Sequence, residues 1–171
     1  ITVLSPRMQF VFNKRSGLVT SYKVNGTEYF AEGFGIQPNF WRAPTDNDYG
    51  ANLPVRLKAW KEASYQEPKA ESFQVTPGSN ATTIKVTYRF PQTDARWDIT
   101  YKIYASGVIK VDNRFVAEGD QAPMIPRVGL RMQLPESFTD LTYYGRGPKE
   151  NYRDRRTSQF IGEYAIPVKN M

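Results

Sequence analysis

The chain has 171 residues, of which 40% are hydrophobic and 14% aromatic, and a formal net charge of +6. This composition indicates a folded globular protein of one domain, spanning residues 1–171, rather than a disordered chain. Because the sequence contains no cysteine and no histidine, it excludes disulfides, thiolate chemistry, serine–histidine hydrolysis and most zinc chemistry within these residues.

The basic balance raises the question of anionic partners. Lys and Arg are scattered along the expected strands, with one cluster at Arg146, Lys149, Arg153, Arg155 and Arg156. No nucleic-acid-binding motif accompanies this charge, so we expect solvated surface and local ion pairs. No apolar run reaches the roughly 18–20 residues of a membrane helix. We therefore predict neither a nucleic-acid nor a membrane partner, and the sequence does not choose between cytoplasm and periplasm.

Residues 8–30 show the pattern of three strands joined by two turns. Phe10 and Phe12 alternate with polar neighbours, as a half-buried strand requires. Asn25 and Gly26 are typical of a tight hairpin turn, because both accept a positive φ. We expect a short antiparallel meander here.

Residues 33–50 are rich in Gly, Pro, Asn and Asp and predict a long ordered loop. One helix is expected after it, over residues 53–63. Asn52 can cap this helix, and Pro54 suits its first turn because the missing N–H is not needed there. Trp60 is expected to pack in the core.

Alternating apolar residues return after Pro68 and predict further strands joined by short turns. The expected strands span residues 83–90, 97–104, 108–116, 124–134 and 139–144. This spacing favours an all-β fold, an antiparallel β-sandwich with one short helix. The run from Tyr164 to the end has no turn, so we expect either a self-contained unit or a homo-oligomer that covers an open sheet edge.

The loop holds the most distinctive segment of the sequence. It reads Pro38-Asn39-Phe40-Trp41-Arg42-Ala43-Pro44-Thr45-Asp46-Asn47-Asp48-Tyr49-Gly50. Trp41 could stack on the apolar face of a pyranose. Arg42, Asp46, Asn47 and Asp48 could exchange hydrogen bonds with sugar hydroxyls. In the alternative, structural interpretation the Asp46 and Asn47 side chains bond to local backbone, and Arg42 pairs with a carboxylate inside the loop.

Two other interpretations of this loop fit less well. An EF-hand calcium loop would need glycine at the sixth position, where the chain has Ala51. Asp46 and Asp48 could form the carboxylate pair of a glycosidase, but residues at i and i+2 of an extended loop tend to point apart. We therefore predict neither a metal site nor a catalytic residue in this segment.

A second motif follows near the end of the chain. It reads Gly145-Arg146-Gly147-Pro148-Lys149-Glu150-Asn151-Tyr152-Arg153-Asp154-Arg155. Two glycines and a proline predict a tight turn. The polar residues Arg146, Glu150 and Asn151 beside it could bind a ligand or form salt bridges across a domain contact.

Both motifs, in this order, resemble those of the C-terminal small-chain domain of lacZ-like β-galactosidases, members of glycoside hydrolase family 2. The resemblance covers most of this chain but only the front part of that domain. It implies part of a large β-sandwich of the galactose-mutarotase-like type. It also implies that the chain, which begins at Ile1, is a piece of a longer protein.

The resemblance also carries functional expectations. The parent reaction would be retaining hydrolysis of terminal β-D-galactosides by two glutamates on a preceding (β/α)₈ barrel, outside this chain. Any Mg²⁺ site would also lie on that barrel, so no cofactor is expected here. Ser64 and Tyr65 align with a family stretch near the mouth of the catalytic pocket. The chain would then help to form the rim of the active site and pack against the other domains or subunits of its parent.

A different class of function stays open at this point. The aromatic content and Trp41 also permit a stand-alone carbohydrate-binding module. In the family, however, a tryptophan that lines the sugar pocket comes from the later part of the domain, beyond residue 171. Sugar binding by this chain alone is therefore the alternative rather than the leading hypothesis.

Overall fold

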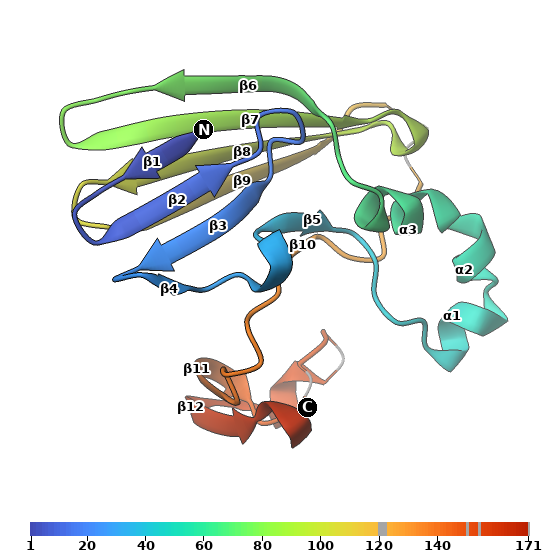
Figure 1. Ribbon diagram of the computed structural model, residues 1–171. Coiled ribbons are helices and arrows are strands. Elements are labelled where there is room, and N and C mark those ends of the chain that lie inside the picture. Colours follow the sequence, from blue (N-terminus) through green and yellow to red (C-terminus); the bar gives the residue numbers. More distant parts are fainter. Residues whose placement is uncertain (120–122, 150, 154, 171) are drawn as a thin grey trace. The chain divides into compact units, whose positions relative to one another are not determined.

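The structure is a computed structural model that describes residues 1–119, 123–149, 151–153 and 155–170. The contacts within the chain divide it into two units, Ile1–Gln133 and Leu134–Met171. The first unit contains two four-stranded sheets, a two-stranded ribbon and the described α-helices, and the second contains a β-hairpin (Figure 1). Short 3-10 helices span Ala31–Gly33, Pro91–Thr93, Arg156–Ser158 and Val168–Asn170.

The first sheet confirms the meander predicted from residues 8–30. Its strands are antiparallel and lie in the order β1 (Thr2–Leu4), β2 (Met8–Phe12), β3 (Val19–Val24) and β4 (Thr27–Glu28). The β3–β4 turn places both Asn25 and Gly26 at positive φ, 50° and 83°. The Asn-Gly pair therefore makes the tight hairpin turn that its backbone preferences indicate.

The second sheet is longer and carries most of the core. Its antiparallel order is β6 (Ala70–Thr76), β7 (Ala81–Phe90), β8 (Ala95–Tyr104) and β9 (Ile109–Ala117). Along β8 the residues from Ala95 to Ile103 alternate strictly between the buried core face and the outer face. This period of two is the pattern that predicted the strand from the sequence.

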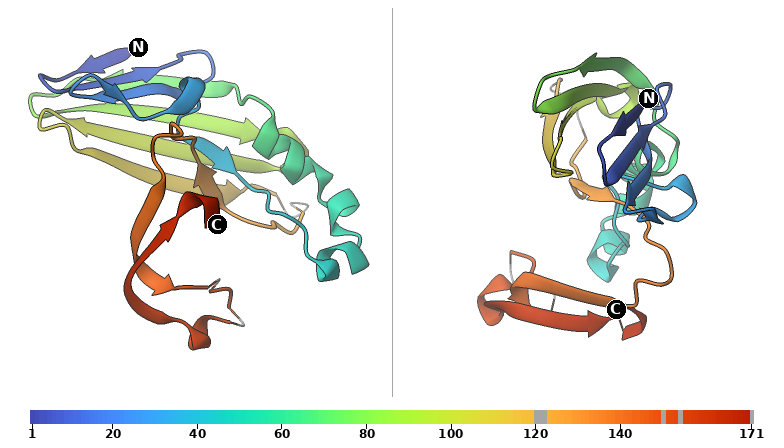
Figure 2. Two further views of the ribbon diagram at one scale, coloured as in Figure 1. Left: turned by 60° about the horizontal axis from the view of Figure 1, so that its bottom comes forward. Right: turned by 60° about the vertical axis from the view of Figure 1, so that its left-hand side comes forward.

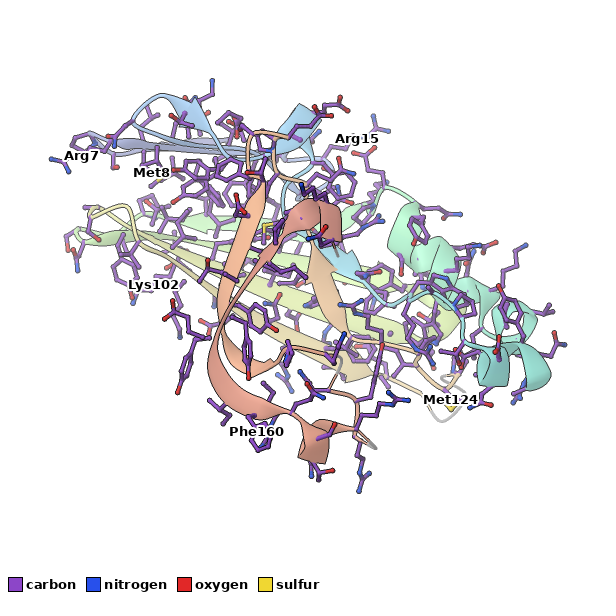
Figure 3. The ribbon with its side chains drawn as sticks, turned by 90° about the horizontal axis from the view of Figure 1, so that it is seen from below. Arg7, Met8, Arg15, Lys102, Met124 and Phe160 are labelled. Carbon is purple, nitrogen blue, oxygen red and sulfur yellow. The ribbon has the colours of Figure 1, made fainter. Side chains whose placement is uncertain are left out.

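The two sheets pack face to face, and Figure 2 shows them as two layers of the first unit. Aromatic rings fill the space between them: Tyr101 of β8 lies 5.0 Å from Phe12 and 6.1 Å from Phe10 of β2, between ring centroids. Met8 of β2 is buried in the same layer (Figure 3). The antiparallel β-sandwich predicted from the sequence is thereby confirmed.

Two tyrosine hydroxyls are buried in this core. Among the described residues, the hydroxyl groups of Tyr88 and Tyr101 have no hydrogen-bond partner. Burial raises the pKa of both phenols well above the usual range, because the charged form would be poorly solvated there. Both groups are therefore neutral at every physiological pH.

The strand predicted over residues 124–134 is mostly wrong. Only Gly129–Arg131 (β10) forms a strand, and it pairs with β5 (Gln37–Asn39) through Gly129 opposite Asn39. The predicted loop over residues 33–50 therefore contains a short strand. Apolar alternation alone did not distinguish a strand from an extended segment with proline nearby.

The helical segment also differs from the prediction. The described residues form three α-helices rather than one: α1 (Asp46–Gly50), α2 (Leu53–Arg56) and α3 (Lys58–Tyr65). Leu57, at φ −110° and ψ 20°, interrupts the predicted helix, and Asn52 adopts a left-handed conformation without a capping side-chain bond. None of the helices in the described ranges is long and apolar enough to span a membrane.

The second unit is built around one hairpin. β11 (Asp140–Gly147) and β12 (Phe160–Pro167) pair along their full length, from Asp140 opposite Pro167 to Gly147 opposite Phe160. Tyr143 and Tyr164 lie side by side on it, with ring centroids 5.4 Å apart. The predicted strand at residues 139–144 is therefore confirmed, and the run after Tyr164 is partly paired within the chain.

Packing at Gly17 gives a test of the sandwich. Gly17 has φ +73°, and an added Cβ would lie 2.5 Å from Val86 Cγ1 and 2.8 Å from the Tyr88 hydroxyl. We expect Gly17→Ala to lower the free energy of unfolding by about 2–5 kcal/mol, because backbone strain and overpacking add. Chemical denaturation measures this change.

Gly26 provides the matched control, because it has φ +83° but nothing within 4 Å of an added Cβ. Gly26→Ala should lower the free energy of unfolding by only about 1–2 kcal/mol, the cost of the left-handed backbone. Equal losses in the two variants would show that Gly17 is not packed against β7 as described.

Candidate functional site

The first motif is anchored in the core by Phe40, which follows strand β5. Its ring is fully buried. Its centroid lies 5.2 Å from those of both Trp60 and Trp97, 5.1 Å from that of Phe90 and 5.5 Å from that of Phe115. These contacts join the loop, helix α3 and the second sheet. The motif therefore starts from a fixed point and projects outward from it.

Next to this anchor the structure forms a hollow of about 260 Å³. Three residues of the first motif that the sequence analysis selected, Trp41, Arg42 and Asp48, line it. The other lining residues are Pro44, Leu53, Pro54, Leu57, Met124, Ile125 and Pro126. Figure 3 shows Met124 beside the helical segment. The hollow is thus mainly apolar, with one charged side.

That charged side is an ion pair between Arg42 and Asp48. The guanidinium makes two contacts with the carboxylate, Nη1 to Oδ2 at 2.6 Å and Nη2 to Oδ1 at 2.9 Å. The backbone N–H of Thr45 also donates to Oδ2, at 2.8 Å, in the arrangement of a capping box at the start of α1. The structural interpretation, in which Arg42 pairs with a carboxylate inside the loop, is present in the geometry.

These contacts set the ionisation of Asp48. The Thr45 backbone N–H, and with it the Arg42 guanidinium and the Thr45 hydroxyl, hold the pKa of the Asp48 carboxyl below its usual range, although burial opposes them. Asp48 is therefore a stable carboxylate near neutral pH. A general acid would need the opposite shift.

Trp41 is less accessible than a sugar-stacking residue at the surface would be. Only 8% of it is exposed. Its backbone N–H donates to Asn39 Oδ1 at 3.2 Å, and the Lys61 ammonium lies 6.0 Å from the centre of its ring. The indole forms a wall of the hollow, and contact with a ligand would have to come from inside it.

Asp46 and Asn47 differ from Asp48 in their surroundings. Both are exposed on α1, whereas Asp48 is buried. Within the described ranges, no side-chain hydrogen bond or ion pair is observed for Asp46 or Asn47. The structure therefore brings Arg42 and Asp48 together and leaves these two polar side chains facing solvent.

Ser64 and Tyr65, at the end of α3, also have contrasting environments. Ser64 is buried: its hydroxyl donates to the Trp60 carbonyl at 2.8 Å and accepts the Phe40 N–H at 2.8 Å. Ser64 therefore ties the helix to the first motif. Tyr65 is exposed, and the Arg131 guanidinium lies 4.6 Å from the centre of its ring.

Arg131 was not selected from the sequence. It lies on β10, 66 positions after Tyr65 in the chain, and its Nη2 donates to the Ser64 carbonyl. No local motif marks it, because its contacts depend on the pairing of β10 with β5. No local motif marks Met124, Ile125 and Pro126 either, although they line the hollow together with the first motif.

The second motif lies in the second unit, where its polar groups hold the end of the hairpin. Arg146 Nη1 donates to the carbonyls of Gln159, at 3.0 Å, and Arg156, at 3.3 Å. Asn151 Nδ2 donates to the Arg146 carbonyl at 3.3 Å. Glu150 lies outside the described residues. The described contacts of Arg146 and Asn151 are thus local and structural.

The described residues contain no group of three or more acidic side chains placed to hold a metal ion. Together, the first-motif hollow and the exposed side chains of Asp46, Asn47 and Tyr65 can offer apolar walls, hydrogen-bond partners and one paired charge. This arrangement suits positioning of a neutral polar molecule or of a neighbouring protein surface.

The pH dependence of stability tests the role of Asp48. Its lowered pKa means that the carboxylate stabilises the fold above the pKa of the unfolded state, and that this contribution is lost as the pH falls through the folded-state pKa. We expect Asp48→Asn to lower the Tm at pH 7. The Tm difference from the unsubstituted chain should shrink steadily toward acidic pH.

Asp46→Asn is the matched control, since Asp46 is exposed on the same helix. It should leave the Tm nearly unchanged at every pH. A Tm difference for Asp48→Asn that stays constant from neutral to acidic pH would contradict the assigned ion pair.

Comparison with known proteins identifies the family. Residues 5–171 match the family model described as "Beta galactosidase small chain". A β-galactosidase of Priestia megaterium is 37% identical over 169 residues, and the aligned region covers 99% of this chain and 16% of that protein. These matches confirm the resemblance that the two motifs carried.

Further β-galactosidases are similar to this chain over nearly its whole length. That of Lactobacillus delbrueckii subsp. bulgaricus is 34% identical over 94% of this chain, and that of Streptococcus thermophilus 30% identical over 99%. The chain spans only 16% of the length of these relatives. The chain belongs to the β-galactosidase small-chain family.

Proposed function

We propose that this chain is a non-catalytic part of a retaining β-galactosidase of glycoside hydrolase family 2, which hydrolyses terminal β-D-galactosides. The observation that carries the proposal is the match of nearly the whole chain to β-galactosidases. The matched region is only 16% of the length of the Priestia megaterium protein. In retaining hydrolysis one carboxylate attacks the sugar to form a covalent glycosyl-enzyme. A second carboxyl group first protonates the leaving group and then acts as a base on the attacking water.

Both catalytic groups are assigned to the remainder of the parent protein. The carboxylate that lines the hollow, Asp48, is paired with Arg42 and has a lowered pKa. A proton donor to the glycosidic oxygen needs a raised pKa instead. The lowered pKa and the ion pair of Asp48 therefore favour a structural role for this carboxylate over a catalytic one.

The role proposed for the chain is to form part of the rim of the active site. Asp46 and Asn47 are exposed on α1, and Tyr65 is exposed at the end of α3, next to Ser64, which bonds to the anchor residue Phe40. Amide and carboxylate groups can exchange hydrogen bonds with sugar hydroxyls, and an aromatic ring can cover a C–H face. The partly buried Arg42–Asp48 pair and the buried Ser64 would hold this surface in place.

The proposed partners are the remaining domains of the parent enzyme, a β-galactoside substrate and, in a homo-oligomer, further copies of the chain. Large apolar side chains are exposed in both units, among them Val55 in the first. Phe160 is an example in the second (Figure 3). Apolar side chains exposed in this way support packing against other protein surfaces. The second-motif residues Arg146, Glu150 and Asn151 are proposed to belong to such domain contacts.

Hydrolysis of o-nitrophenyl β-galactoside tests the division of labour. The intact protein encoded around this sequence should hydrolyse the substrate, and the isolated chain should show no hydrolysis above the uncatalysed rate. Activity of the isolated chain would contradict the assignment of the catalytic groups to the rest of the protein. An inactive intact protein would contradict the proposed activity itself.

Substitution of the rim residues tests the proposed role. Asn47→Ala in the intact enzyme should raise the KM for a β-galactoside about 2- to 10-fold, the loss of a hydrogen bond, without lowering the Tm. Asn80→Ala is the matched control, because Asn80 is exposed in the turn between β6 and β7 and lies outside the proposed rim. An unchanged KM for Asn47→Ala and Asp46→Ala together would exclude a substrate contact by α1.

A further inference from the structure

The tight turn between β3 and β4 places an asparagine directly before a glycine. Asn25 and Gly26 are both exposed, and Asn25 is the one asparagine of the sequence that is followed by glycine. An asparagine side chain can react with the backbone nitrogen of the next residue, and a Cβ on that residue hinders the approach. Since glycine has no Cβ, this hindrance is absent at Gly26.

The two groups that would react are not engaged elsewhere. Among the described residues, neither the side-chain amide of Asn25 nor the N–H of Gly26 makes a hydrogen bond, and an added Cβ at Gly26 would meet nothing within 4 Å. Asn13 and Asn39 differ, because the Oδ1 of Asn13 accepts the Arg15 N–H at 2.9 Å and that of Asn39 accepts the Trp41 N–H at 3.2 Å. The Asn25 amide is therefore available for reaction, whereas these two are held.

The closed turn itself opposes the reaction. Ring closure requires rotation about the Cα–C bond of Asn25, which a tight turn holds fixed. This turn, however, is closed by a very short strand at the end of the sheet order: β4 pairs with β3 only through Glu28 opposite Lys23 and Thr27 opposite Val24. So short a pairing opens locally at a small cost in free energy.

Glu28 limits how far this opening extends. Its carboxylate accepts the Ser21 hydroxyl and three backbone N–H groups at 2.9, 3.1 and 3.0 Å, those of Tyr22, Tyr29 and Phe30. Because these bonds fix the chain directly after the turn, the opening is confined to residues 25–27. The rest of the first sheet stays formed while the turn is open.

We propose that Asn25 is a site of spontaneous deamidation in the folded protein, with Gly26 as the internal nucleophile. The Gly26 nitrogen bonds to Cγ of Asn25, and the bond from Cγ to the amide nitrogen breaks. That nitrogen leaves as ammonia and takes the proton of the Gly26 N–H, which leaves a cyclic imide. Water then adds across one of the two C–N bonds between the imide nitrogen and its carbonyl carbons. The products are aspartate or isoaspartate, and no group is oxidised or reduced.

The two products affect the turn differently. Aspartate keeps the course of the backbone and adds a negative charge at an exposed position. Isoaspartate lengthens the backbone by a methylene group, so the connection from Val24 to Thr27 no longer fits a tight two-residue turn. The modification therefore changes the edge of the first sheet at β4.

Incubation of the intact protein at mildly alkaline pH, followed by tryptic digestion and mass spectrometry, tests the proposal. One tryptic peptide, residues 24–42, contains both Asn25 and Asn39, so Asn39 serves as a reference within the same peptide. The Asn25 amide should be lost with time, while Asn39 stays unmodified. Isoaspartyl methyltransferase should methylate the same peptide, because isoaspartate is one of the products.

Two substitutions and a second reference site complete the test. Gly26→Ala should suppress the loss of the Asn25 amide, because the added Cβ hinders the attacking nitrogen. Glu28→Gln should accelerate it, because a weaker anchor lets the turn open more often. Asn80 is the matched reference, since it is exposed in a turn but precedes Ala81.

Three results would overturn the proposal. The first is loss of the Asn25 amide no faster than that of Asn80. The second is an equal rate in Gly26→Ala, and the third is a reaction that occurs only in the urea-denatured chain. An unchanged rate in Glu28→Gln would contradict the local opening of β4 on which the reaction in the folded protein depends.

Discussion

Burial of the Phe40 ring is the interaction on which the rest of the first unit depends. This ring meets Trp60 of α3 and Trp97 of β8 at the same distance, 5.2 Å between centroids. Trp60 also contacts Phe115 of β9 directly, at 5.9 Å between centroids, and Phe40 completes this common core of the helical segment and the second sheet. The backbone N–H of Phe40 also bonds to Ser64, so one residue sets both the packing and the position of the helix end. The loop that follows Phe40 therefore begins at a fixed position.

From that anchor the first motif divides into two kinds of residue. Trp41, Arg42 and Asp48 face inward and line the hollow, where their charges and rings are already partnered. Asp46 and Asn47 face solvent on α1. The first motif thus combines residues that line the hollow and stabilise the loop with residues whose side chains are exposed to solvent. The carbohydrate contacts proposed above fall to the second kind.

Much of the sandwich could be predicted from the sequence, because strands with one buried face alternate visibly, as β8 does. The breaks in the helical segment could not be predicted, since no local pattern marks the interruption at Leu57, and Asn52, a residue type that tolerates the left-handed conformation, was expected to cap the helix. The strand predicted over residues 124–134 shrank to β10, because alternation does not show whether a partner strand exists. Asp48 and Arg42 were identified by their chemistry. Arg131 was not, because its contacts join segments far apart in the chain.

The adjacency of Phe40 and Trp41 has a consequence for how proteins of this family can vary in sequence. One ring fills the core and the next walls the hollow, so a substitution at Trp41 acts on a backbone that also fixes Phe40. Changes there would alter the packing of the core as well as the wall of the hollow. The exposed side chains of α1 and of the end of α3 do not pack in this core. Substitutions at these outward positions can therefore change the chemistry of the surface without disturbing the packing around Phe40.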